Sequence, residues 1–263
     1  MHHGHPPAAC TKCAGDIQLG FDFTMAFQPI VNAKTQDIFA YEALARGPNN
    51  EPAGWVFAQI NEQNRYRFDQ QCRIKAIEQA ARLRMPALLS INFMPNAVYN
   101  PERCIRTTLE AADASGFPID QIVFEITESE KVSDLVHLRE IVSYYKQRGF
   151  KTAIDDFGAG YSGLNLLADI QTDFVKLDMA LIRNIHQDRI RQIIVRGILQ
   201  VCQELPVTTI AEGIETVEEF RVLQDFGIDL FQGYYFARPA FQALPEVPSS
   251  VFTRTERDSA EPP

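Results

Sequence analysis

Residues 122–156 read IVFEITESEKVSDLVHLREIVSYYKQRGFKTAIDD and contain the pattern that decides the fold. Two short runs rich in β-branched residues, Ile122–Thr127 and Lys151–Asp155, flank a longer stretch, Ser133–Arg148, whose apolar residues recur every three or four positions. The short runs predict strands and the longer stretch predicts a helix. A strand, a helix and a second strand in this order form the unit from which parallel sheets are built.

The same alternation continues along most of the chain. Further strands are predicted at Ala26–Val31, Ile38–Leu44, Leu88–Asn92, Phe174–Leu177, Val207–Ala211 and Leu230–Gln232. Further helices are predicted at Asp69–Arg84, Glu102–Ser115, Ile190–Glu204 and Val217–Phe226. Seven or eight strands with intervening helices indicate an α/β fold of the (β/α)8 barrel class.

Nothing in the sequence divides this barrel into smaller domains. There is no Gly/Ser linker and no repeat of fixed period. We assign residues 21–247 to one domain. Residues 1–20 are small and polar, and the charged, proline-containing C-terminal end follows the last predicted strand. We therefore expect a flexible N-terminal arm at residues 1–20 and a flexible tail at residues 248–263.

Composition excludes some classes of partner. The 263 residues include 25 Lys and Arg against 34 Asp and Glu, a formal net charge of -9. This charge argues against non-specific binding of a nucleic-acid polymer. No apolar run is long enough to cross a bilayer, and the N-terminus lacks the features of a signal peptide. Five scattered cysteines do not form a secreted disulfide scaffold. We expect a cytoplasmic protein without a membrane or nucleic-acid polymer partner.

The N-terminal arm contains one motif with chemical potential. Cys10 and Cys13 form a C-x-x-C pair, and His2, His3 and His5 precede it. Such a pair suits zinc binding or redox chemistry, although it supplies only half of a tetrahedral zinc site. The simpler interpretation is a flexible terminal arm without such a function.

Polar residues collect at the ends of the predicted strands. They are Glu42 within the second strand, followed by Asn92, Glu125, Asp155, Asp156, Lys176, Glu212 and Gln232. The carboxyl ends of barrel strands meet at one rim, where the catalytic groups of such barrels lie. A single acid at a strand end is more often a helix cap or a solvated residue, and we interpret Asp178 as a cap. The joint occurrence of the others favours a functional site.

Several buried carboxylates at one rim repel one another unless cations neutralise them. Carboxylate, amide and water oxygens are the ligands that Mg²⁺ and Mn²⁺ prefer, and histidine and cysteine are absent near these strand ends, which disfavours zinc and copper. The adjacent Asp155 and Asp156 allow one carboxylate to bridge two ions while the other binds one. Paired cations activate water in phosphoryl transfer. Lys176 is either an ordinary rim lysine or the group that balances this charge and orients the water.

Around these residues the sequence resembles the motif series of the EAL family of cyclic di-GMP phosphodiesterases. The signature is Glu42-Ala43-Leu44, with Arg46 two residues later. The accompanying motifs, in family order, are Phe27-Gln28-Pro29-Ile30, Asn92, Glu125-Ile126-Thr127-Glu128, Asp155-Asp156-Phe157-Gly158-Ala159-Gly160-Tyr161-Ser162, Lys176-Leu177-Asp178, Ala211-Glu212-Gly213-Ile214-Glu215 and Phe231-Gln232-Gly233-Tyr234. The resemblance runs from about Phe23 to Pro239.

The resemblance implies a modified TIM (β/α)8 barrel whose first strand runs antiparallel to the others, and hydrolysis of cyclic di-GMP to linear 5′-pGpG. It implies two divalent cations, Mg²⁺ or Mn²⁺. The expected ligands of the first are Glu42, Asn92, Glu125 and Asp155. The expected ligands of the second are Asp155, Asp156 and Glu212.

The same resemblance assigns roles to further residues. Lys176 is expected to orient or help deprotonate the attacking water, with support from Glu215, so that the catalytic set is Lys176, Glu212, Glu215 and Asp155. The expected substrate contacts are Gln28, Arg46 and Gln232, where the forked guanidinium of Arg46 suits a phosphate oxygen. Glu128 is expected to anchor the loop that begins at Asp155. Family members also form homodimers, for which the apolar face of Met179–Ile198 is a candidate.

Two departures from the family pattern concern the mouth of the pocket. Gly163 stands where many members have a second serine, and Gly47 stands where a tryptophan or similar residue follows the arginine. The stretch after Arg46 is also short, as in EAL domains attached to BLUF modules. Two alternatives to hydrolysis of cyclic di-GMP remain at this point: a non-catalytic receptor or protein-interaction module, and a two-metal phosphodiesterase for another nucleotide.

Overall fold

The structure is a computed structural model that describes residues 19–127, 134–160 and 163–253. Its strands are β1 (Thr24–Asn32), β2 (Asp37–Arg46), β3 (Leu88–Phe93), β4 (Ile122–Thr127), β5 (Lys151–Phe157), β6 (Phe174–Leu177), β7 (Thr208–Ala211), β8 (Leu230–Gln232) and β9 (Ala240–Phe241). Its helices are α1 (Ala53–Phe57), α2 (Arg65–Arg82), α3 (Pro101–Cys104), α4 (Arg106–Ser115), α5 (Leu135–Gln147), α6 (Gly163–Asp169), α7 (Met179–Ile182), α8 (Arg189–Glu204) and α9 (Val217–Asp225).

The first eight strands close into a barrel. Neighbours follow the order β2 to β8, then β1, and the pairing of β1 with β2 completes the ring. The strands from β2 to β8 are mutually parallel, whereas β1 is antiparallel to both β2 and β8. The predicted modified TIM barrel with an antiparallel first strand is therefore confirmed. The short strand β9 pairs in antiparallel fashion with β1 at Ala26 and Phe27.

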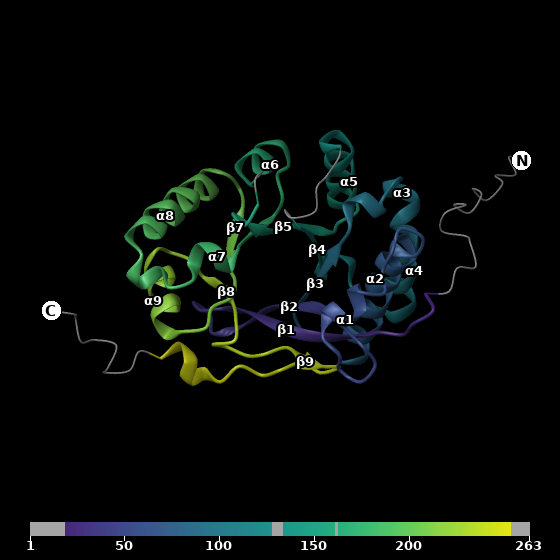
Figure 1. Ribbon diagram of the computed structural model, residues 1–263, viewed down its shortest axis with the longest axis horizontal. Coiled ribbons are helices and arrows are strands. Elements are labelled where there is room, and N and C mark those ends of the chain that lie inside the picture. The colour runs from purple at the N-terminus through teal and green to yellow at the C-terminus, as the bar shows by residue number, and fades with distance from the viewer. Residues whose placement is uncertain (1–18, 128–133, 161–162, 254–263) are drawn as a thin grey trace, which may run out of the picture.

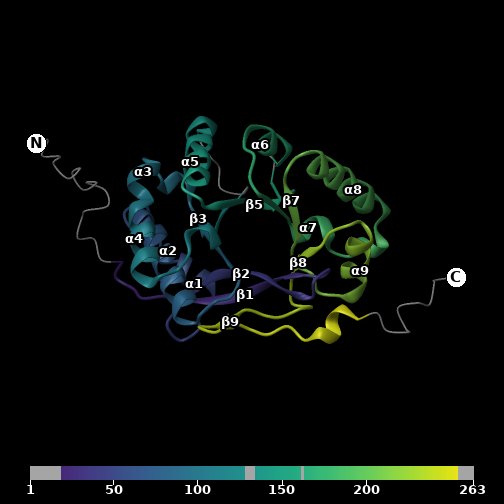
Figure 2. The same ribbon diagram turned by 180° about the vertical axis from the view of Figure 1, so that it is seen from behind.

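Helices surround this ring. Figure 1 shows α2, α4 and α5 on one side of the strands and α8 and α9 on the other, and the reverse view in Figure 2 shows the same division. The large apolar core lies between strands and helices, where residues such as Phe124, Ile141 and Val195 are completely buried. Among the described helices, none combines the length and the apolar character needed to cross a membrane.

Local sequence explains where the helices begin. Asp134 precedes α5 and accepts a hydrogen bond from the backbone N–H of His137 at 3.0 Å. Thr216 and Glu219 form a reciprocal capping box at the start of α9. Each such cap satisfies N–H groups that have no partner within the helix, a contribution of about 1 kcal/mol. The predicted helix at 102–115 is divided at Ile105 into α3 and α4.

The segment after β8 returns along β1, as the yellow ribbon in Figure 1 shows. It ends in a 3-10 turn, Ser249–Phe252, whose Phe252 side chain is buried. Arg221 of α9 donates a hydrogen bond to the carbonyl oxygen of Thr253 at 2.7 Å. The tail that the sequence predicts from residue 248 therefore begins with a segment that packs on the barrel.

The inside of the barrel is divided into two layers. One layer is apolar and consists of Ile30, Ala40, Val123, Ala153, Phe174, Ile210 and Leu230. Side chains alternate between the two faces of a strand, so the residue two positions away points into the barrel again. In each of these strands that position carries a polar residue. The apolar layer thus supports a polar layer at the carboxyl rim of the parallel strands.

Candidate active site

The polar layer contains one side chain from each barrel strand or from the residue directly after it. Its members are Gln28, Glu42, Ser90, Glu125, Asp155, Lys176, Glu212 and Gln232. In β2 and β4 to β8 the polar residue follows its apolar partner, whereas in antiparallel β1 it precedes it, so Gln28 comes before Ile30. Glu212 continues the β7 ladder, because its N–H donates to the carbonyl oxygen of Leu177 at 3.1 Å.

Lys176 lies at the centre of the acids and is only 1% exposed. Its Nζ donates hydrogen bonds to Glu125 Oε2 and Asp155 Oδ1, each at 2.9 Å. Two more carboxylate oxygens are close: Glu212 Oε1 lies at 2.5 Å, without hydrogen-bond alignment, and Glu42 Oε2 at 3.6 Å. Burial lowers the pKa of Lys176, but the surrounding carboxylates outweigh this effect and hold the pKa well above its usual value. The ammonium therefore balances the acids as a full positive charge.

A β-bulge brings two consecutive aspartates into the same site. In the pairing of β5 with β6, Ile154 faces Val175 and Phe157 faces Leu177, so Asp155 and Asp156 together oppose Lys176. Asp156 has a φ of 55°, in the left-handed region. Without the bulge, consecutive residues would point to opposite faces of the sheet.

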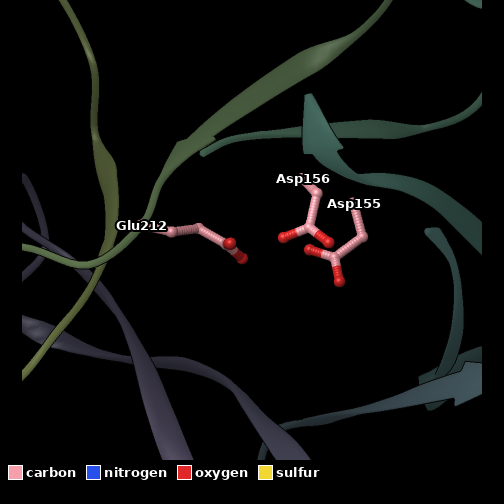
Figure 3. Close-up of side chains that lie close together, drawn as sticks. All are labelled: Asp155, Asp156 and Glu212. Atoms are coloured by element: carbon pink, nitrogen blue, oxygen red, sulfur yellow. The ribbon is translucent and has the colours of Figure 1, made fainter. Parts of the chain in front are cut away.

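The bulged aspartates of β5 also lie close to Glu212, which directly follows β7, two strands along the rim. One carboxylate oxygen from each of Asp155, Asp156 and Glu212 lies within 4.8 Å of the others. Figure 3 shows the two aspartates side by side, with the Glu212 carboxylate pointing toward them. Three oxygens at this spacing suit a divalent cation.

Amide side chains orient Glu42. Asn92 Nδ2 donates to Glu42 Oε1 at 2.8 Å, and Gln232 Nε2 donates to Glu42 Oε2 at 2.7 Å. Gln232 Nε2 also lies 3.4 Å from Gln28 Oε1, and Gln28 Nε2 donates to the carbonyl oxygen of Ala237 at 3.3 Å. Within the described part of the chain, Gln232 Oε1 is buried and has no hydrogen-bond partner. This arrangement leaves amide oxygens as possible contacts for a cation or a substrate.

Burial gives the acids of this site a high affinity for positive charge. Desolvation raises the pKa of Glu125 to about 8, against the opposing charge of Lys176. Desolvation, with the charge of Asp155, raises the pKa of Asp156 to about 6. Burial also raises the pKa of Glu212 well above its usual value. Such oxygens bind either protons or metal ions, and the all-oxygen donor set fits Mg²⁺ or Mn²⁺.

A pocket of about 530 Å³ opens beside these residues. Asn92, Asp155 and Asp156 form its polar wall. The rest of the lining is largely apolar and includes Met25, Leu44, Phe57, Phe68 and Met94. A cavity of this size and composition is typical of a site for a small organic ligand with charged groups at one end.

The other predicted residues take different positions. Arg46, half-buried at the end of β2, donates from Nη1 to the carbonyl oxygen of Ala45 at 2.8 Å. Glu215 accepts a hydrogen bond from Arg183 Nη2 at 2.9 Å, and no contact with Lys176 is found in the described chain. Asp178 caps α7 by accepting from the N–H of Ala180 at 2.7 Å, as predicted. Glu128 and the Cys10–Cys13 motif lie outside the described residues.

Two residues near the site were not found from the sequence. The Ser90 hydroxyl donates a hydrogen bond to Glu125 Oε1 at 2.5 Å. The sequence could have predicted this position, because side chains alternate along β3 and Ser90 therefore lies on the same face as Asn92. Asp69 of α2 lines the pocket. The only signal in the sequence is that Asp69 and Arg73, one turn apart, lie on the same face of the predicted helix.

The arrangement matches known proteins. The sequence model described as EAL domain matches residues 16–239. A standalone versatile EAL protein from Vibrio cholerae O395, solved in its c-di-GMP bound form, is 58% identical with a TM-score of 0.87, and the match covers 90% of this chain and 100% of that one. BlrP1 from Klebsiella pneumoniae, solved as a manganese/cy-diGMP complex at pH 9.0, is 37% identical with a TM-score of 0.81, over 86% of this chain and 58% of that one.

Sequence comparison with curated proteins finds the same family. BluF from Escherichia coli (strain K12), described as a blue light- and temperature-regulated antirepressor, is 32% identical over 223 residues, which are 84% of this chain and 55% of BluF. The chain thus spans about half the length of this curated relative, and less of others. Because the family match includes every barrel strand and the whole polar layer, this chain belongs to the EAL domain family.

Proposed function

We propose that this protein hydrolyses cyclic di-GMP to linear 5′-pGpG with two divalent cations, Mg²⁺ or Mn²⁺. The single observation that carries this proposal is the group of acids around Lys176, called the acid ring below. It consists of Glu42, Glu125, Asp155, Asp156 and Glu212. Four carboxylates lie within 3.6 Å of Lys176 Nζ, and Asp156 joins them through the bulge in β5. Relatives solved with cyclic di-GMP, one of them with manganese, support the same substrate and cofactor.

The cations have separate ligand sets in this proposal. Glu42, Asn92, Glu125 and Asp155 would hold one ion. Asp155, Asp156 and Glu212 would hold the other, so that Asp155 bridges the pair. When bound, such ions lower the pKa of water and stabilise charge on phosphate oxygens.

The chain itself positions the reacting groups. Lys176 keeps its proton, and its Nζ is rigidly held by Glu125 and Asp155, so it can donate a hydrogen bond that orients the attacking water. Glu215 supports this site indirectly, because its carboxylate binds Arg183 and its N–H donates to Glu219 Oε2 at 3.0 Å. The Arg183 contact joins the segment after β6 to the loop after β7. Lys176 lies in β6 itself and Glu212 directly follows β7.

Substrate recognition uses the rim and the pocket. Arg46 has a forked guanidinium with donors available for a phosphate oxygen. Gln28 and Gln232 present amide groups from adjacent strands. The apolar wall of the pocket suits a purine ring, whose burial would be stabilised by aromatic contact with residues such as Phe57.

The protein is further proposed to form a homodimer through α8. Val195, Leu199 and Cys202 of this helix face the core. A second apolar stripe, at helical spacing, is exposed to solvent and consists of Ile190 (71%), Ile193 (57%), Ile194 (46%) and Val201 (41%). Contiguous exposed apolar residues of this kind mark interaction surfaces. We therefore assign this exposed stripe, rather than the buried face of α8, to the proposed interface.

One observation favours a second function. BluF, to which the chain is 32% identical, is described as an antirepressor, and an EAL module that binds cyclic di-GMP or a protein without hydrolysis would suit that description. The intact acid ring favours hydrolysis over this alternative, because a receptor needs no group that activates water.

The experiment that tests the proposal is product analysis by chromatography. Purified protein is incubated with cyclic di-GMP and Mn²⁺ or Mg²⁺, with and without chelator, beside the Asp155→Asn variant. We expect pGpG from the wild type with metal only, and at least a 100-fold loss in the variant, as for removal of a group that holds the reacting atoms. Calorimetric binding of cyclic di-GMP without pGpG under any metal condition would instead establish the receptor. Faster turnover of another cyclic or linear nucleotide would assign a different substrate.

A further inference from the structure

A buried ion pair lies between α2, α5 and the end of β3, outside the acid ring. Arg73 of α2 is 0% exposed and Asp69, one turn earlier, is 3% exposed. Arg73 Nη2 contacts Asp69 Oδ2, and Arg73 Nη1 lies 3.5 Å from the hydroxyl oxygen of Tyr145 in α5. Burying two charges is costly, and an apolar pair of similar volume is often at least as stable. Stability alone therefore does not account for this pair.

The other oxygen of Asp69 binds the backbone beyond β3. Asp69 Oδ1 accepts a hydrogen bond from the N–H of Met94 at 2.9 Å. Met94 is two residues after Asn92. Asp69, Asn92 and Met94 all line the pocket. Because Arg73 occupies one carboxylate oxygen of Asp69, it fixes the orientation in which the second oxygen holds Met94.

Tyr145 contacts the same segment from α5. Its ring packs against the ring of Phe93, with centroids 5.8 Å apart. Phe93 lies between Asn92 and Met94 in the chain. Residues 92–94 are thus held by Asp69 on one side and by Tyr145 on the other, and Arg73 contacts both of these side chains.

We propose that Arg73 is a positioning residue that acts through Asp69 and Tyr145 to fix the segment Asn92–Met94. Asn92 donates from Nδ2 to Glu42, so a fixed backbone keeps the Asn92 amide beside the acids, where its oxygen would be available to a cation. The inference rests on the proposed function in one respect, the role of Asn92 as a metal ligand. Partners that orient metal ligands from outside change metal affinity by about 10- to 100-fold when they are lost.

The test is calorimetric titration of metal-free protein with Mn²⁺, which needs no turnover. The double variant Asp69→Asn/Arg73→Met removes both charges, so no unpaired charge is left in the core. We expect it to bind Mn²⁺ at least 10-fold more weakly than the wild type and to raise KM more than it lowers kcat. Arg73→Lys keeps the charge but loses the fork, and we expect an intermediate affinity. The control is Arg139→Met, which breaks the exposed Arg139–Asp169 pair at 2.8 Å and should leave Mn²⁺ binding unchanged.

The outcomes separate this inference from the proposed function. Weaker Mn²⁺ binding in the double variant supports the positioning role even if the wild type proves unable to hydrolyse cyclic di-GMP. A lower melting temperature with unchanged Mn²⁺ affinity would show that the pair is only structural, and would overturn the inference. If the double variant does not fold, the Arg73→Lys variant decides. An Mn²⁺ affinity equal to that of the wild type in this variant would also overturn the inference. Absence of Mn²⁺ binding by the wild type would remove both proposals.

Discussion

Single residues decide whether the acids of this site act together. Lys176 is the residue on which their coexistence depends, because its ammonium lies among four carboxylates and its pKa is held well above the usual value. Without a positive charge at this position, buried carboxylates take up protons or force the site apart. Lys176 therefore has a structural role without metal in addition to its proposed catalytic role.

Replacement of Lys176 by methionine separates these two roles. We expect the melting temperature in chelator to fall, because the carboxylates lose their counterion, and Mn²⁺ to restore most of the loss. Hydrolysis should fall by about 10²-fold even with metal, because the attacking water loses the hydrogen bond that orients it. Thermal unfolding measures the melting temperature, and initial rates measure hydrolysis. Lys34→Met, at an exposed turn lysine, is the control, and a wild-type melting temperature for Lys176→Met in chelator would refute the structural role.

The acids also give stability a pH dependence of defined sign. The pKa is raised to about 8 for Glu125 and to about 6 for Asp156, whereas in unfolded chains such groups titrate near pH 4. A raised pKa means that the folded state binds protons more tightly. The resulting stabilisation is complete below about pH 4 and is lost as the pH rises through about 6 and then 8.

We therefore expect this acid-ring contribution to the melting temperature of the metal-free protein to decrease between about pH 5 and pH 8.5. Mn²⁺ should raise the melting temperature more at the upper end of this range, because deprotonated carboxylates bind it better. Unfolding followed by circular dichroism, with chelator or with Mn²⁺, measures both effects. Glu125→Gln mimics the protonated acid and is expected to show a flatter pH dependence. If its profile is as steep as that of the wild type, the assignment to Glu125 is incorrect.

The sequence predicts these residues unequally, for physical reasons. Strand-end acids such as Glu125 and Glu212 are found because side chains on a strand alternate regularly and strand ends share a rim. The joint inward direction of Asp155 and Asp156 depends on a bulge, which periodicity does not reveal. Arg73 was missed because an Asp–Arg pair one turn apart on a helix is usually exposed to solvent, and only the folded structure shows that this pair is buried against Tyr145 of α5.

At the scale of elements, the site depends on how closely the segment after β8 approaches the loop after β7. The N–H of Ile214 donates to the carbonyl oxygen of Gln232 at 3.0 Å, and the N–H of Tyr235 donates to the carbonyl oxygen of Ile214 at 3.0 Å. Gly233 lies between these bonds. A Cβ atom on Gly233 would lie 2.1 Å from the Ile214 carbonyl oxygen. Only glycine permits this approach, which places Gln232 beside Glu212.

Gly233→Ala tests this contact. The added methyl group meets backbone rather than a movable side chain, so the two segments must separate. We expect a loss of about 1 to 3 kcal/mol in the free energy of unfolding, as for other overpacked sites, together with weaker cyclic di-GMP binding. Urea denaturation gives the first quantity and calorimetry the second. The control, Gly54→Ala in α1, has no atom within 4 Å of the new Cβ and should be neutral or slightly stabilising, and equal effects at both glycines would contradict the account.

Element boundaries show the same limits of prediction. All eight barrel strands were predicted, and β4, β6 and β8 have the predicted bounds. Strand β5 extends two residues further because the chain rejoins β6 after its bulge. Helices α1, α6 and α7 and strand β9 were missed because segments of two to seven residues are too short to show a period.

At the scale of the whole molecule, the antiparallel first strand closes the barrel and places the amino-terminal half of β1 at the rim that carries the acids. Gln28 pairs with Glu42 for this reason. Periodicity predicts that β1 is a strand but contains no information on its direction, so this feature followed only from the family resemblance. The exposed stripe on α8 likewise became distinguishable from the core face only in the folded structure.

The proposed homodimer can be tested by a charge in this stripe. Ile193→Glu places a carboxylate where an apolar partner surface is expected, and burying an unpaired charge costs several kcal/mol. We expect the wild type to be dimeric and the variant monomeric at micromolar concentration in light scattering coupled to size-exclusion chromatography. Val136→Glu, on α5 at a residue that is 66% exposed, should remain dimeric. A dimeric Ile193→Glu variant would place the interface elsewhere.

The claim that the acid ring is a two-cation phosphodiesterase site is tested most directly by titrating metal-free protein with Mn²⁺ while bound metal and pGpG formation are measured in the same samples. The account predicts that hydrolysis appears as the second ion binds, with two ions per chain at full activity. Asp156→Asn should retain one ion and little activity. Full hydrolysis with one ion per chain, or in the presence of chelator, would contradict it.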